Sequence, residues 1–99
     1  MAIEFIVAEG IIADIFEIID WYNSKRPGLG ERFYNELLNE FESIKRNPVK
    51  YAYYTKDFRR AVLKHFPYLI IFTATENAIV IYLVIYGGRN PELINKKIN

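Results

Sequence analysis

The stretch that decides the fold runs from Phe58 to Pro91 and reads FRRAVLKHFPYLIIFTATENAIVIYLVIYGGRNP. It is rich in β-branched and aromatic residues, which favour strands. The predicted strands span residues 58–64, 68–75 and 78–86. His65-Phe66-Pro67 turns the chain after the first strand, and Glu76-Asn77 fits a two-residue hairpin between the last two. The pattern predicts three successive strands that the rest of the chain supports.

The alternation of side chains along a strand assigns these residues to two faces. The basic face of the first strand carries Arg60, Val62 and Lys64, and its other face carries Arg59, Ala61 and Leu63. The helix-packed core set of the last strand is expected to be Ile79, Ile81, Leu83 and Ile85. The opposite set, expected to be open or covered by another chain, is Val80, Tyr82, Val84 and Tyr86.

The chain before this stretch supplies one strand and two helices. Ile3 to Val7 is a short apolar run that suits a strand. Apolar residues then recur at helical spacing over 11–22 and again over 33–44. The connector between them contains Pro27 and two glycines, which cannot continue a helix. We therefore expect one α+β domain over residues 1–99, in which a two-helix hairpin packs on a mainly antiparallel sheet in the order β-α-α-β-β-β.

Composition limits the kinds of protein this chain can be. Ninety-nine residues fit a single domain with one core. With no cysteine, the chain has no disulfide or thiolate chemistry. It has no secretory leader pattern and no apolar run of the roughly 18 residues that a membrane helix needs, so we expect a cytoplasmic protein with no membrane association. Hydrophobic content of 52% favours a dense core together with apolar surface for a partner.

The formal net charge of +1 hides an uneven distribution along the chain. Residues 1–44 carry nine acidic and three basic side chains, a net of −6. Residues 45–65 carry seven basic side chains and one acidic side chain, a net of +6. The basic segment is either a solvated loop or a surface for phosphates or an acidic partner.

Few residues in the chain carry obvious chemistry. His65, the only histidine, is a candidate acid–base group or a corner residue bonded to backbone. Arg89 follows a glycine pair and precedes a proline, which suits either a functional arginine or a structural cap. The carboxylates show no metal-ligand clustering with histidine, and no glycine loop suited to phosphates is present. We predict neither a metal nor a cofactor.

Four fragments in this order resemble the RelE/ParE superfamily of type II toxins, which includes plasmid stabilisation proteins. The fragments are Glu17-Ile18-Ile19-Asp20-Trp21-Tyr22, Arg26-Pro27-Gly28-Leu29-Gly30, the corner Arg60…Leu63…Phe66-Pro67-Tyr68, and Gly88-Arg89-Asn90-Pro91. The resemblance spans nearly the whole chain. It implies a growth-inhibiting toxin that a cognate antitoxin neutralises.

The resemblance also implies candidate site residues. Members of the superfamily are metal-independent, ribosome-dependent endonucleases of messenger RNA or inhibitors of DNA gyrase. By position, Arg60 and Lys64 would lie near the phosphate, Arg89 would stabilise transition-state charge, and Tyr86 would donate a proton or stack. Many nucleases of the superfamily have arginine where this chain has Leu69, and many members have histidine in place of Tyr86. Both differences favour a gyrase target. The alternatives are an endonuclease and a degenerate member that only binds antitoxin.

The expected antitoxin surface lies on the open face of the sheet. Val62, Tyr82 and Val84, beside Arg60 and Lys64, suit an acidic amphipathic helix or an added strand. Without the antitoxin we expect self-association, for example as a homodimer.

Overall fold

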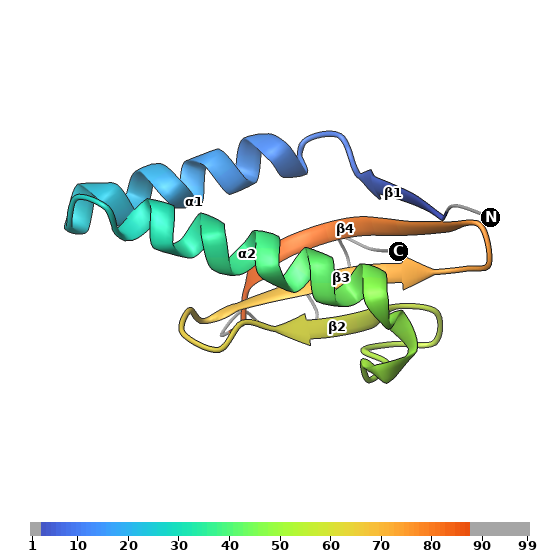
Figure 1. Ribbon diagram of the computed structural model, residues 1–99. Helices are drawn as coiled ribbons and strands as arrows, with labels where there is room; N and C mark the ends of the chain where they lie inside the picture. The colour runs from blue at the N-terminus through green and yellow to red at the C-terminus, as the bar shows by residue number, and fades with distance from the viewer. Residues whose placement is uncertain (1–2, 88–99) are drawn as a thin grey trace.

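The computed structural model describes residues 3–87 of the chain. In chain order the elements are β1 (Glu4–Val7), α1 (Ile11–Lys25), α2 (Leu29–Arg46), the short 3-10 helix η1 (Pro48–Lys50), β2 (Arg59–Val62), β3 (Tyr68–Ala74) and β4 (Ala78–Tyr86). The strands form one sheet in the order β1-β4-β3-β2, and the two helices lie against one of its faces (Figure 1). β1 runs parallel to β4, and the other pairs are antiparallel. The predicted α+β class and element order are confirmed.

Glycines set the geometry of the helical hairpin at three points. Gly10 and Gly28, which precede α1 and α2, have φ of 89° and 88°, a left-handed conformation that other residues rarely adopt. Gly30 lies at a close contact between the two helices. A Cβ on Gly30 would clash with the Ile19 carbonyl oxygen and lie 2.7 Å from Nδ2 of Asn23. Asn23 Oδ1 accepts the Gly30 N–H at 2.8 Å, so this contact fixes the spacing of the helices.

The core lies between the hairpin and the sheet. Its largest fully buried side chains are Phe33, Leu37, Ile44, Ile70, Phe72, Ile79 and Ile81, and Ile71 is also fully buried but lies on the other face of the sheet, where it pairs with Arg60. Removing a side chain of this size from water contributes about 1.5–3 kcal/mol to stability. β4 spans the predicted residues 78–86. It contributes Ile79 and Ile81 to this core. No helix among residues 3–87 is long and apolar enough to cross a membrane.

One expectation about β4 is wrong, because the ladder between β3 and β4 contains a bulge. Adjacent residues Ile71 and Phe72 of β3 face Leu83 and Ile81, which leaves Tyr82 as an extra residue in β4. The alternation therefore reverses beyond Tyr82.

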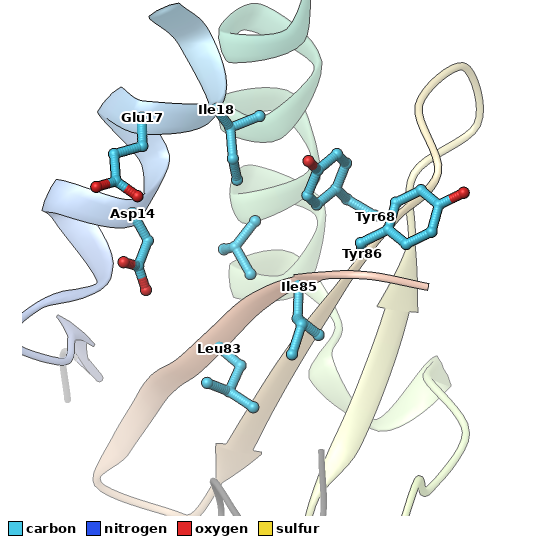
Figure 2. Close-up of a pocket in the computed structure, with 8 residues that line it drawn as sticks. Asp14, Glu17, Ile18, Tyr68, Leu83, Ile85 and Tyr86 are labelled. Atoms are coloured by element: carbon cyan, nitrogen blue, oxygen red, sulfur yellow. The ribbon is translucent and has the colours of Figure 1, made fainter. Parts of the chain in front are cut away.

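The reversal moves Val84 from the open face to the side of the sheet that the helices cover. Val84 pairs with fully buried Ile70 and is only 6% exposed, so it is not an accessible partner contact. The same reversal places Tyr86 on the helix side, where it pairs with Tyr68. Leu83 and Ile85, which were predicted to pack on the helices, are buried on the other side of β4 and project away from Ile18 of α1 (Figure 2).

Arg59 anchors the irregular segment 47–57 to the sheet. Its guanidinium lies 4.0 Å from the centre of the Tyr53 ring. It donates hydrogen bonds to the Tyr51 carbonyl at 2.7 Å and to the Tyr53 hydroxyl at 2.9 Å. The N–H of Arg60 also donates to the Ala52 carbonyl at 3.0 Å. The segment thus covers the outer edge of β2.

Candidate functional site

The open face of β2 carries the first group of candidate residues. Arg60 and Val62 are exposed, and the Arg60 guanidinium has no hydrogen bond or ion pair with residues 3–87. The alternation that buries Ala61 on the helix side places both residues on the opposite face. Phe58, two residues before Arg60, contacts the Tyr82 ring edge-on at 5.2 Å between ring centres. These residues form a cationic face with an aromatic neighbour.

Neighbouring arginines on β2 therefore have different roles. Arg59 is held by backbone carbonyls and by the Tyr53 ring, so it stabilises the covering segment. Arg60 is exposed, and none of the described residues pairs with its charge. The prediction that these two residues lie on opposite faces is confirmed.

Lys64 and His65 lie in the corner after β2, beside helix α2. Because β2 ends at Val62, the strand alternation does not extend to Lys64. Lys64 and His65 instead line a surface hollow with Glu36, Asn39 and Glu40. Lys64 is exposed, but it lies in this hollow beside α2 and not on the open sheet face where the sequence placed it.

The Glu36 carboxylate fixes this corner. One oxygen lies 2.7 Å from Nδ1 of His65, and the other accepts the His65 backbone N–H at 2.9 Å. Burial acts to raise the pKa of Glu36, but the hydrogen bonds and charge of His65, with a further bond from the Lys64 backbone, lower that pKa below its ordinary value. The His65 ring thus has a carboxylate partner and not the backbone partner expected from the sequence. Sequence analysis did not identify Glu36, which lies 29 residues away along the chain.

Tyr86 belongs to an aromatic cluster at the end of β4. It is 48% exposed, and its ring contacts Tyr68 at 5.9 Å between ring centres. Tyr68 in turn contacts Tyr22 and Phe33. A surface hollow lies beside this cluster. It is lined by Trp21, Tyr22, Pro67, Tyr68 and Tyr86. Trp21 lies at its rim, 54% exposed, with the Lys25 ammonium 5.0 Å from its ring centre.

The candidate catalytic residues therefore occupy three different settings. Arg60 lies on the open sheet face, Lys64 beside α2, and Tyr86 in the aromatic cluster. Arg89 lies outside the described residues. Within residues 3–87 there is no group of three or more side chains that could hold a metal ion.

The outer surface of the hairpin carries an apolar groove that sequence analysis missed. Four large side chains, each exposed by more than a third, lie along it: Ile12, Phe16, Tyr34 and Leu38. Each helix contributes a pair at i and i+4, beside the buried residues that reach the sheet. All four belong to the apolar stripes over 11–22 and 33–44, whose helical periodicity predicts residues that pack on the sheet. The sheet covers only part of this wide apolar stripe, so the remainder forms surface.

Comparison with known proteins places this chain in a class. Residues 5–91 match the family described as ParE toxin of type II toxin-antitoxin system, parDE. Toxin ParE2 from two strains of Mycobacterium tuberculosis is 29% identical over 94 residues, covering 94% of this chain and 90% of the relative. A solved structure, from the chromosomal ParDE TA system of P. aeruginosa, superposes with a TM-score of 0.74 at 15% identity. That superposition covers 85% of this chain and 95% of the other.

The protein is therefore a toxin of a type II toxin–antitoxin system. Within that class, the chain belongs to the ParE toxin family, of the parDE type.

Proposed function

We propose that this toxin acts on DNA gyrase and is neutralised by a cognate antitoxin. The observation that carries the choice of target is the scatter of the candidate nuclease residues. Cleavage of RNA without a metal requires charged and proton-donating groups aimed at one phosphate. Arg60, Lys64 and Tyr86 lie in separate settings.

Leu69 supports the same choice. It follows the aromatic corner, is half-buried and pairs with Val62 and Ile85 in the sheet. An apolar side chain at this position offers no charge to a phosphate. A protein target fits better, because the exposed Arg60, Val62 and Tyr82 combine charge with apolar area.

Expression of the chain without its antitoxin tests this function. We expect growth arrest with accumulation of gyrase–DNA cleavage complexes and intact messages in a primer-extension scan. Arrest with cut messages and no gyrase complexes would support the second candidate, a ribosome-dependent endonuclease, which the exposed guanidinium of Arg60, unpaired within residues 3–87, favours. Absence of arrest would leave a member that only binds antitoxin.

Two apolar surfaces are available for the antitoxin. The hairpin groove of Ile12, Phe16, Tyr34 and Leu38 suits the apolar side of an amphipathic helix. The cationic sheet face, with Arg60 and Val62, suits an acidic segment. Because the helices lie against the opposite face of the sheet (Figure 1), an antitoxin that contacts both surfaces must wrap around the toxin.

Charge reversal at each surface tests this placement. We expect Phe16→Glu and Tyr82→Glu each to weaken antitoxin binding at least about tenfold. Each variant places a carboxylate where the bound antitoxin would bury apolar side chains. Glu76→Gln, in the exposed β3–β4 turn, is the matched control and is expected to bind normally. Unchanged affinity in both charge-reversal variants would refute both surfaces.

A further inference from the structure

Helix α2 carries a stripe of exposed side chains that is apolar in the middle and charged toward both ends. Tyr34 and Leu38 lie in the middle, at the hairpin groove, and are 38% and 39% exposed. Glu31 lies near the beginning of the helix, and Glu42 and Lys45 lie near its end, all three exposed. Steps of three or four residues place these five side chains on one face of the helix. The stripe therefore begins with an acidic residue and ends with a basic one.

The spacing of the stripe is the same in both directions from Leu38. Glu31 and Lys45 each lie seven residues from Leu38, which is two helical turns or about 10 Å. Tyr34 and Glu42 each lie four residues from it. When a second copy of the helix is laid antiparallel on the first, with Leu38 against Leu38, Glu31 meets Lys45 and Tyr34 meets Glu42. Each of these contacts pairs a carboxylate with a group that can donate a hydrogen bond to it.

The contacts that these charges make within one chain lie at the surface. Glu31 accepts a hydrogen bond from Nδ2 of Asn23 at 3.2 Å. The Lys45 ammonium lies 2.9 Å from the Glu42 carboxylate, and the two side chains are 43% and 59% exposed. Exposed pairs of this kind contribute little to stability. They can therefore be exchanged for contacts with a second copy at a small cost in free energy.

Helix α1 adds apolar area beside this stripe. Ile12 and Phe16 are 54% and 56% exposed, and they line the same groove as Tyr34 and Leu38. A side chain of this size has on the order of 200 Å² to bury, so the four together present about 370 Å² per copy. Two copies would bury about 700 Å² of this apolar surface, and with a polar rim the total approaches the roughly 1,200 Å² of the smallest specific interfaces. This area suits a weak, reversible dimer.

We propose that a second copy of the same chain covers the hairpin groove when the antitoxin is absent. A two-fold axis crosses α2 at Leu38, at right angles to the helix, so that the two α2 helices pack antiparallel and α1 lies over α1. The four helices then lie between the two sheets and cross at about 20°, as in helix bundles.

The dimer does not depend on the target of the toxin. Its relation to the antitoxin rests on the proposed function, which places the antitoxin in the same groove. On that placement, the second copy and the antitoxin exclude each other.

Sedimentation equilibrium of the purified full chain, without antitoxin, tests the dimer. We expect a reversible equilibrium between monomer and dimer for the wild type. Leu38→Glu should weaken the dimer at least about tenfold, because two carboxylates then meet at the axis. Urea unfolding of this variant is expected to remain cooperative, since Leu38 is exposed by more than a third.

Charge reversal at the two ends of the stripe tests the antiparallel arrangement. Glu31→Lys and Lys45→Glu, each alone, should weaken dimerisation at least about fivefold, because each places like charges opposite one another twice in the dimer. An equimolar mixture of these two variants should dimerise as strongly as the wild type, because every end contact again joins opposite charges. Glu17→Lys, a matched charge reversal at an exposed position of α1 outside the groove, is expected to leave dimerisation unchanged.

Three results would count against the dimer. A wild-type chain that remains monomeric up to its solubility limit would overturn the proposal. Association that Leu38→Glu and the single charge variants leave unchanged would assign it to non-specific apolar contact and refute the site. A mixture of Glu31→Lys with Lys45→Glu that dimerises no more strongly than either alone would contradict the antiparallel pairing. Since these measurements use neither gyrase nor DNA, failure of the dimer is distinct from failure of the proposed function.

Discussion

The two sides of the sheet differ in how the described residues cover them. On the β2 side, the segment 47–57 lies over the edge, Arg59 anchors that segment, and the Ala52 carbonyl accepts the Arg60 N–H. On the other side, β1 covers only the first half of β4. Proteins generally cover or charge such edges to prevent unwanted pairing. Within residues 3–87 the two sides therefore differ in cover: the segment 47–57 fixes the edge of β2, and the exposed residues Arg60 and Val62 lie on the face of that strand.

The largest expected effect concerns Gly30, which holds α1 close to α2 and so sets the position of α1 beside β4. Gly30→Ala would force the added methyl group against the Ile19 carbonyl and Asn23. We expect a loss of about 3 kcal/mol in the free energy of unfolding, measured in urea. Gly87→Ala is the control, because its methyl group would meet Leu69 at an ordinary 3.6 Å and should change stability by less than about 0.5 kcal/mol. Equal stability of the two variants would contradict the close helix approach.

The next effect separates the two arginines of β2. Arg59→Ala removes the bonds to the Tyr51 and Val49 carbonyls and the stacking on Tyr53, so we expect a loss of about 2 kcal/mol. Hydrogen exchange of the Arg60 amide should also accelerate as the covering segment loosens. Arg60→Ala should leave stability within about 0.5 kcal/mol, because its side chain is exposed and unpaired among the described residues. The comparison of the edges fails if Arg60→Ala proves the more destabilising change.

A smaller effect concerns the corner that follows β2. Because the folded pKa of Glu36 is depressed, its contribution to stability is present above the ordinary glutamate pKa and is lost as pH falls through the folded value. Glu36→Gln should therefore cost about 1 kcal/mol at pH 7, with the difference from wild type shrinking between pH 5 and pH 3. Thermal unfolding across this range measures it, with Glu76→Gln as the control. A cost that does not change with pH would assign the effect to packing and not to the charge.

The fold could be predicted from the sequence, and the reasons lie in particular segments. The apolar run 78–86 and the turn before it determine β4, and the connector around Pro27 determines the hairpin. The bulge at Tyr82 could not be predicted, because apolar residues occupy both sides of it and no glycine or polar residue marks the shift. Val84 was therefore assigned to the open face. Because apolar residues occupy every position of β4 around Tyr82, the sequence is compatible with two registers of β4 against β3. Only the observed pairing with β3 shows which register the strand adopts.

The candidate site was less accessible to sequence reasoning. Alternation correctly separated Arg59 from Arg60, but it could not place Lys64 once the strand had ended. Contacts between distant residues, such as Glu36 with His65, leave no local pattern. The hairpin groove escaped notice because helical periodicity identifies an apolar stripe without giving the width that the sheet covers.

The central claim, that the toxin acts on gyrase through exposed side chains of the cationic face, is tested most directly with purified proteins. Gyrase and plasmid DNA are incubated with the wild-type chain, with Arg60→Ala and with Tyr86→Phe, and cleaved DNA is measured. We predict cleavage complexes with the wild type and with Tyr86→Phe, and a loss of at least about tenfold with Arg60→Ala. No complexes with folded wild-type chain, or full activity of Arg60→Ala, would contradict the account.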